Sequence, residues 1–163
     1  MKGNQEVIDA LNTALLLELT AINLYFVQAE MCKKWGYLKL GAKQRRESIE
    51  EMHHAEAEIK RILFLDGTPV ARTEQIRVGP NVLEMFETDL ALEMRGVEAY
   101  NQGIATCLKV GDSGSREVLE HILIETEQHV EWLESQLHII NEIGLDNYLA
   151  DQIGEEEEEG ETA

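Results

Sequence analysis

The stretch from Ile8 to Cys32, IDALNTALLLELTAINLYFVQAEMC, decides how this sequence folds. Its apolar residues recur every three or four positions, which is the spacing of one face of an α-helix. The members of this stripe are Ile8, Leu11, Leu15, Glu18, Ile22, Tyr25, Ala29 and Cys32. Glu18 therefore occupies a position where an apolar core residue is expected. Tyr25 is expected in the core as well, where its hydroxyl could hydrogen-bond to a metal-binding side chain.

Three further segments of about 25 to 30 residues show the same helical spacing. In the segment 38–65, Glu51 lies within the apolar stripe and His54 lies at its edge. The next segment follows Asn81 and Glu84, which form a capping box, and it carries Glu93 in its stripe. The last long segment opens near Ser115, and its stripe is interrupted by two polar residues, Thr126 and His129.

These segments predict an all-α protein built as a four-helix bundle. Alternating runs rich in Val, Ile and Thr are missing, so we expect no sheet. Short turns join the first helix to the second and the third to the fourth, which favours antiparallel neighbours. The 15 residues from 67 to 81 could extend about 50 Å and form a long crossover between helices two and three. Residues 145–153 predict a short fifth helix, so the domain spans 1–154, and 155–163 predict a disordered acidic tail.

Composition narrows the classes of function. A length of 163 residues suits one domain, and 32 acidic against 14 basic residues give a net charge of −18. Such a charge argues against nucleic acid as a partner and fits a protein that handles cations. Neither a leader-like apolar stretch nor a membrane-length apolar run stands out, so we expect a cytoplasmic protein without a membrane partner. Cys32 and Cys107 are far apart in sequence and read as small buried hydrophobic residues.

The polar residues in the four stripes point to a metal centre. They are Glu18, Glu51 with His54, Glu93, and His129. A buried ionised carboxylate needs a cation, and a di-iron centre in a helix bundle uses Glu side chains together with Glu-x-x-His pairs. One Glu-x-x-His pair alone is weak support for a metal centre, since Glu50 and His53 form another such pair. The stronger support is that all four helices carry a polar residue in the apolar stripe. Three histidines are expected at the surface or its boundary: His53, His121 and His138. Met52 lies about 100° around its helix from Glu51 and could face a neighbouring subunit, although simple packing explains most such residues.

Several segments together resemble the bacterioferritins, the haem-containing branch of the ferritins. They are 1–3 (MKG), 18–23 (ELTAIN), 47–52 (ESIEEM), 61–65 (RILFL), 89–93 (DLALE), 129–134 (HVEWLE) and 147–149 (NYL). The resemblance implies a ferritin-like four-helix bundle with a short fifth helix, assembled into a shell of 24 subunits. It also implies storage of iron as a ferric mineral, after oxidation of Fe(II) by oxygen or peroxide at a di-iron ferroxidase centre within each subunit. By position, the metal ligands and catalytic residues of this centre are Glu18, Glu51, His54, Glu93 and His129. Met52 matches the residue that ligates haem b together with its copy on a second subunit.

One position departs from the family pattern. The bacterioferritins carry a bridging Glu three residues before the last His ligand, where this sequence has Thr126. Glu125 lies about 40° around the helix from His129 and is a candidate substitute, whereas Glu127 lies about 160° away. Arg46 stands where some relatives have His. We therefore expect a weakened ferroxidase centre, working alone or in a shell shared with a second, fully competent subunit type.

The sequence is compatible with three alternatives. The chain could be a non-catalytic, haem-binding structural subunit of a mixed shell. It could be a non-storage di-iron oxidase or peroxidase, although no cysteine-rich electron-transfer module is present. It could also be a four-helix interaction module, which would bind neither haem nor iron.

Overall fold

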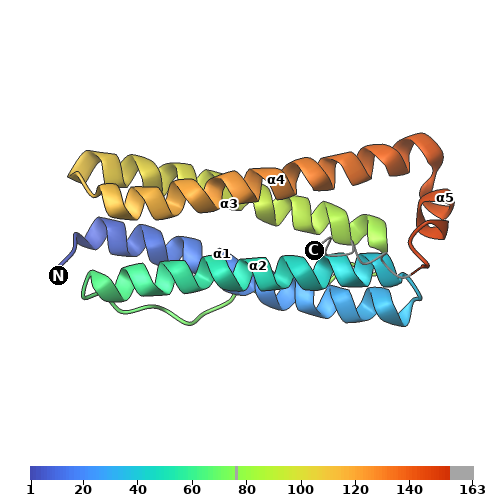
Figure 1. Cartoon of the computed structure of the whole chain (residues 1–163), viewed down its shortest axis with the longest axis horizontal. Helices are drawn as coiled ribbons and strands as arrows, with labels where there is room; N and C mark the ends of the chain where they lie inside the picture. Colours follow the sequence, from blue (N-terminus) through green and yellow to red (C-terminus); the bar gives the residue numbers. More distant parts are fainter. Residues whose placement is uncertain (76, 155–163) are drawn as a thin grey trace, which may run out of the picture.

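A computed structural model describes residues 1–75 and 77–154, and within them the chain forms four long helices and one short one, without strands. The helices are α1 (Gln5–Lys34), α2 (Leu38–Phe64), α3 (Val82–Val110), α4 (Ser113–Ile143) and α5 (Leu145–Ala150). Figure 1 shows the four long helices lying side by side as a bundle. The predicted four-helix bundle with a short fifth helix is thus confirmed, while the predicted acidic tail, 155–163, lies outside the described residues.

Polar caps and glycines set the helix ends. The side chain of Asn4 accepts a hydrogen bond from the backbone N–H of Glu6 at the start of α1, and Asn81 accepts one from Glu84 at the start of α3. The side-chain amide of Asn81 also donates to the Glu84 carboxylate, so the two residues cap the helix reciprocally, with this second bond coming from the side chain of Asn81 where a capping box uses its backbone N–H. Gly111 ends α3 with φ of 76°, a left-handed conformation that glycine adopts without a steric cost. Two boundaries differ from the sequence prediction: α4 begins at Ser113, and α5 ends at Ala150.

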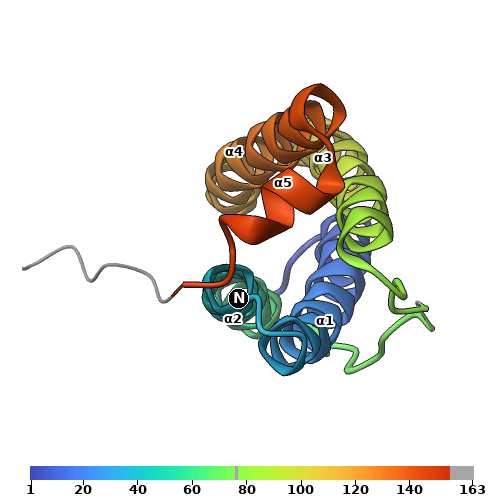
Figure 2. The same ribbon diagram turned by 90° about the vertical axis from the view of Figure 1, so that its right-hand side faces the viewer.

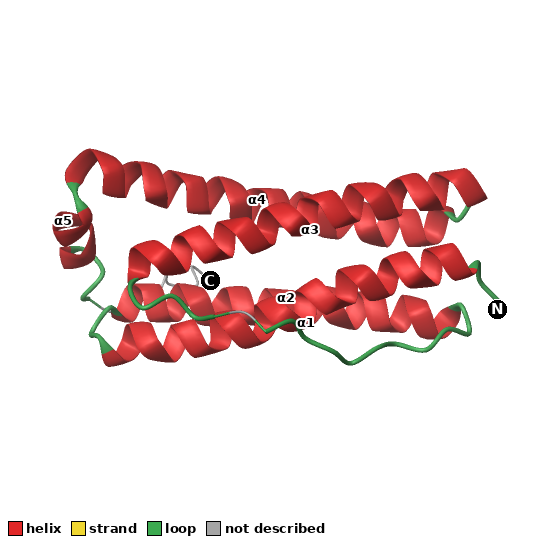
Figure 3. Ribbon diagram, turned by 180° about the vertical axis from the view of Figure 1, so that it is seen from behind, coloured by secondary structure: helices red, strands yellow, loops and turns green. Residues whose placement is uncertain are grey.

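The long crossover between α2 and α3 runs along the outside of α1 (Figure 3). The Asn12 side chain holds it by donating to the carbonyl of Thr68 and accepting from the N–H of Val70. Further along, the backbone N–H of Glu74 donates to the Thr20 hydroxyl, and the Glu74 carboxylate pairs with the guanidinium of Arg95 on α3. The crossover therefore connects α2 to the distant start of α3, as its length predicted.

Two apolar clusters fill the two ends of the bundle. One contains Leu11, Ile62 and Leu119 among others, and the second contains Leu40, Phe86, Leu133 and Tyr148. Figure 2 shows α5 lying across one end of the bundle, where Tyr148 packs edge-on against Phe86. Most of the buried polar side chains lie in the middle of the bundle, together with a third, smaller apolar cluster that includes Leu17, Leu24 and Leu92.

Helix α1 is long and apolar enough to cross a membrane by length and composition alone. Half of that stretch is buried inside the bundle, and the buried side chains include Leu11, Leu15 and Leu24. Core helices of soluble proteins pass the same test, so the apolar character of α1 is accounted for by packing.

Candidate metal centre

Each long helix contributes polar side chains to the middle of the bundle. The five residues that the sequence singled out are all buried: Glu18 on α1, Glu51 and His54 on α2, Glu93 on α3, and His129 on α4. They occupy core positions because the helical spacing places them on the inward faces. The structure therefore brings together all five side chains in one site.

The first group of possible ligands consists of Glu18, Glu51 and His54. One donor atom from each lies within 4.8 Å of the others. The Nδ1 atom of His54 is 2.8 Å from Oε2 of Glu51 and 3.6 Å from Oε2 of Glu18. Two carboxylates and one imidazole nitrogen thus converge on one point, as oxygen and nitrogen donors do around a divalent transition metal.

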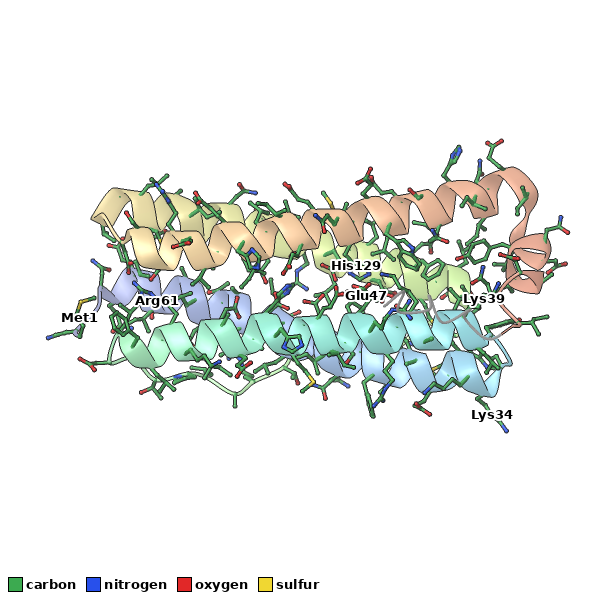
Figure 4. The ribbon with its side chains drawn as sticks, in the orientation of Figure 1. Met1, Lys34, Lys39, Glu47, Arg61 and His129 are labelled. Carbon is green, nitrogen blue, oxygen red and sulfur yellow. The ribbon has the colours of Figure 1, made fainter. Side chains whose placement is uncertain are left out.

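The second group consists of Glu47, Glu51 and His129, whose donor atoms also lie within 4.8 Å of one another. The Nδ1 atom of His129 is 3.0 Å from Oε1 of Glu93 and 3.4 Å from Oε2 of Glu47. Figure 4 shows Glu47 and His129 between α2 and α4, in the middle of the bundle. Because Glu51 belongs to both groups, its carboxylate is placed to bridge two cations.

The protonation of the site reflects its burial. Burial raises the pKa of Glu18, and it raises the pKa of Glu51 and Glu93 with the help of the neighbouring carboxylates. For both histidines burial lowers the pKa, but hydrogen bonds to the carboxylates outweigh it. The pKa of His54 rises to about 12 and that of His129 to about 9. Without metal, protons therefore balance the carboxylates, and a cation that binds must displace them.

Thr126 leaves α4 without a carboxylate in the site. Its side chain is buried, and its hydroxyl donates to the carbonyl of Ile122 on the same helix at 2.9 Å. A cavity of about 10 Å³, bordered by Thr126, Glu18, Glu51 and Glu93 among others, lies beside it. That volume is about the space one water molecule needs. The threonine is thus satisfied by its own backbone and offers the site no charge.

Glu125 does not enter the site as a substitute ligand in this structure. Its side chain is 43% exposed, and Oε2 lies 2.7 Å from Nε2 of His54, the nitrogen that faces away from Glu18 and Glu51. A carboxylate on the outer nitrogen fixes the ring so that Nδ1 faces the ligand carboxylates. Glu125 is therefore an orienting residue for His54.

Sequence reasoning missed two buried carboxylates on α2, Glu47 and Glu58. Glu47 is buried, belongs to the second ligand group and is paired with Lys43. Both lie on the inward face of α2, because 47, 51, 54 and 58 follow the three-four spacing. That spacing could have revealed them, since both extend the inward face on which Glu51 and His54 lie.

Tyr25 touches the site, as its position in the first stripe predicted. Its hydroxyl donates a hydrogen bond to the Glu93 carboxylate, and its ring packs edge-on against His129 with 5.5 Å between the centroids. A hydroxyl on one carboxylate oxygen and an imidazole beside it hold Glu93 in one orientation.

A cavity of about 450 Å³ opens between α2 and α4 and leads to the site. Its lining includes Glu47, Glu50, His53, Glu125 and His129, together with Lys43 above the ring of Trp132. Carboxylates and imidazoles along a passage raise the local concentration of cations. The cavity is thus a path between solvent and the metal-binding groups.

The remaining candidates lie outside this site. Met52 is 54% exposed and points away from the bundle interior, next to the exposed Ile49 one turn earlier. His53, His121 and His138 are exposed, and both cysteines are free and buried. These placements agree with the surface and core positions expected of them.

Fold and site together define a four-helix bundle whose core carries carboxylates and imidazoles arranged for metal ions. The family model described as "Ferritin-like domain" matches residues 8–143. The chain is 46% identical over 154 residues to a bacterial ferritin of Pseudomonas aeruginosa, covering 94% of this chain and all of the relative. It is 42% identical to the bacterioferritin of Brucella melitensis, over 91% of this chain and 92% of the relative. The bacterioferritin of Mycobacterium leprae is 42% identical, over 92% and 95% respectively. The chain belongs to the bacterioferritins, within the ferritin-like family, and this membership supports a role in iron storage.

Proposed function

We propose that the chain stores and detoxifies iron by oxidising Fe(II) at the site in its own bundle and depositing it as a ferric mineral inside a shell of subunits. The observation that carries this proposal is the position of Glu51, which belongs to both ligand groups. A carboxylate shared by two groups can hold two cations close together, which is what a reaction requiring two one-electron donors needs.

The donor set fits iron as substrate. Carboxylate oxygens and neutral imidazole nitrogens are suitable ligands for iron, and Glu18, Glu51, His54, Glu93 and His129 supply them. Two Fe(II) ions give up one electron each. Dioxygen takes up these two electrons and two protons to form hydrogen peroxide, or peroxide takes them up with two protons to form two waters. Protons displaced from the carboxylates and histidines when iron binds are available for this step.

Thr126 weakens this centre in the proposal. The bridging carboxylate of the family pattern is replaced by a hydroxyl that is bound to its own helix, so one or both iron sites lose a charged donor. We expect slower oxidation by this chain alone. A shell that also contains a second, fully competent subunit type would restore the rate.

The surface supports assembly into a shell, for which the family resemblance implies 24 copies. Exposed large apolar side chains occur on all four long helices, for example Phe26, Leu63, Met94 and Ile124. Apolar side chains exposed on every helix are expected where subunits pack on several sides. We place this shell in the cytoplasm, as the sequence predicts.

Haem b is the second cofactor of the proposal, held between two subunits by Met52 and its copy. The thioether of Met52 is exposed beside Ile49, and a soft sulfur ligand on an apolar surface fits haem iron. The haem would supply electron transfer when bound, and the chain's own contribution would be the Met52 sulfur that holds it.

A non-catalytic structural and haem-binding subunit is the second candidate function, and the buried, self-satisfied Thr126 is the observation that favours it. In that case Met52 would bind haem while the bundle oxidises no iron. A third possibility, a small non-storage oxidase or peroxidase, predicts that the chain forms no shell, and size-exclusion chromatography separates it from the other two.

The test is stopped-flow absorbance of ferric product after mixing Fe(II) with the purified homopolymer in air. The proposal expects a protein-dependent fast phase that the variant Glu51→Gln lacks and that Thr126→Glu accelerates. A fast phase of unchanged rate in Glu51→Gln would overturn the assignment of the site. Haem absorbance without any iron-dependent oxygen uptake would favour the structural subunit.

A further inference from the structure

Glu58 is the most deeply buried carboxylate of the bundle for which the bundle offers no partner. Its side chain is 0% exposed, and within residues 1–75 and 77–154 neither carboxylate oxygen has a hydrogen-bond partner. By contrast, the buried Asp89 accepts hydrogen bonds from Gln28 and Gln44. Buried polar groups are nearly always satisfied, so two unpartnered oxygens on one buried carboxylate indicate a missing ligand.

Helix geometry directs Glu58 towards the metal-binding groups. It lies four residues after His54 and seven after Glu51, on the same face of α2. Side chains in an α-helix lean towards its N-terminus, so the Glu58 carboxylate extends over the preceding turn, which carries His54. The charge of His54 lowers the pKa of Glu58 and the charge of Glu51 raises it, while Glu58 in turn raises the pKa of Glu18. Such effects require that the four groups are close in space.

The first ligand group also lacks a donor. Glu18, Glu51 and His54 offer three ligand atoms, whereas a transition metal in a protein takes at least four. On the side of α4, Thr126 supplies no carboxylate, and Glu125 is on the outer nitrogen of His54. Within residues 1–75 and 77–154, Glu58 is the one buried carboxylate without a hydrogen-bond partner, and it lies on the helix that carries most of the donors.

We infer that Glu58 is an additional ligand of the cation bound by Glu18, Glu51 and His54, and that it supplies the negative charge that Thr126 does not. This inference rests on the proposed function, since it concerns the same metal site. It gives a reason for a buried, unpartnered carboxylate one helical turn beyond the ligands that sequence reasoning had found.

The experiment is a titration of the metal-free assembled protein with Co(II), followed by visible absorbance and by calorimetry. Four proteins are compared: the wild type, Glu58→Gln, Thr126→Glu and the double variant. Glu58→Gln keeps the shape of the side chain and removes its charge. Glu56→Gln is the matched control, because Glu56 is on the same helix but exposed and paired with Lys60.

We expect Glu58→Gln to weaken the tightest Co(II) site by tenfold or more and to lower the intensity of its visible bands. In the Thr126→Glu background the same substitution should change the affinity by less than about threefold, since the restored carboxylate takes over the role. Glu56→Gln should bind as the wild type does. Glu58→Asp keeps the charge on a side chain that is shorter by one methylene group, so its Co(II) affinity should lie between those of the wild type and Glu58→Gln.

Two outcomes overturn the inference: wild-type affinity and spectrum in Glu58→Gln, or an equal loss in both backgrounds. If the wild type itself binds no Co(II), the proposed function fails instead. Removal of a buried charge is not expected to impair folding. Should Glu58→Gln nevertheless fail to fold, Glu58→Asp decides, and wild-type binding by that variant overturns the inference.

Discussion

Replacing Glu51 by Gln should remove both metal sites with one substitution. Glu51 is the member shared by the two ligand groups, so its loss reduces each group from three donors to two. Glu18→Gln reduces only the first group. The structure therefore predicts that two Zn(II) ions per chain remain bound after desalting in the wild type, about one in Glu18→Gln and none in Glu51→Gln.

The magnitude follows from linkage between binding and folding. Zn(II) at 100 times its dissociation constant stabilises the folded state by about 2.7 kcal/mol per site, and therefore by about 5.4 kcal/mol for two sites. For a chain of this size, that raises the melting temperature by roughly 11–22 °C at about 2–4 °C per kcal/mol. A hundredfold loss of affinity at both sites leaves about 0.8 kcal/mol of this stabilisation. The expected shift in Glu51→Gln is then about 2–3 °C.

The assay is thermal unfolding by circular dichroism with and without Zn(II), together with the metal content after desalting. Zn(II) undergoes no redox reaction, so the readout is independent of iron oxidation. Glu56→Gln is the control and should keep the full shift. The metal-free melting temperature of Glu51→Gln should itself fall, because Glu51 is the partner of His54 Nδ1 at 2.8 Å, so the effect of Zn(II) is measured as the shift within each variant. A wild-type shift in Glu51→Gln, or equal metal content in the Glu18 and Glu51 variants, would refute the shared-ligand geometry.

The structure supports four further expectations. Thr126→Glu should lower the melting temperature of the metal-free protein, since it adds a carboxylate beside three buried ones, and should enlarge the shift caused by Zn(II); a decrease in that shift would contradict the argument. Glu125→Gln should weaken Zn(II) binding by about tenfold in calorimetry. This loss of affinity is at the low end of the range for residues that orient a metal ligand, because Glu125 is partly exposed. Unchanged affinity would show that His54 needs no orientation from Glu125. The pKa of His129 is raised to about 9, so its contribution to metal-free stability is complete below its unfolded pKa near 6.5 and is lost as pH rises through 9. Denaturant midpoints between pH 6 and pH 9.5 should therefore decrease, and a rising midpoint would contradict this sign. Met52→Leu should abolish haem absorbance in the purified shell and leave the Zn(II) content unchanged, whereas retained haem would exclude Met52 as its ligand.

The helical bundle was predictable because its determinants are local. Apolar residues such as Leu11, Leu15 and Ile22 repeat with the helical period, and that period alone fixes which face of each helix is buried. Asn4 and Asn81 illustrate the same point at the helix ends, where a cap depends on residues only two or three positions away. The five buried Glu and His residues proposed as ligands were identified in the same way, as polar exceptions in apolar stripes.

The relations between helices were decided only by the tertiary structure. Which carboxylate bridges two ligand groups depends on how α1, α2 and α4 approach one another, and no spacing within one helix reveals that Glu51 does so. Glu125 is close in angle to His129 on its own helix, yet its carboxylate contacts His54 of another helix. Glu58 shows the same limit, because in a chain with 32 acidic residues only burial distinguishes a carboxylate without partners from one in solvent. The sequence by itself determined the helices and their inward faces, since these follow from local periodicity. The pairing of side chains across the core came from packing, which joins residues far apart in the chain.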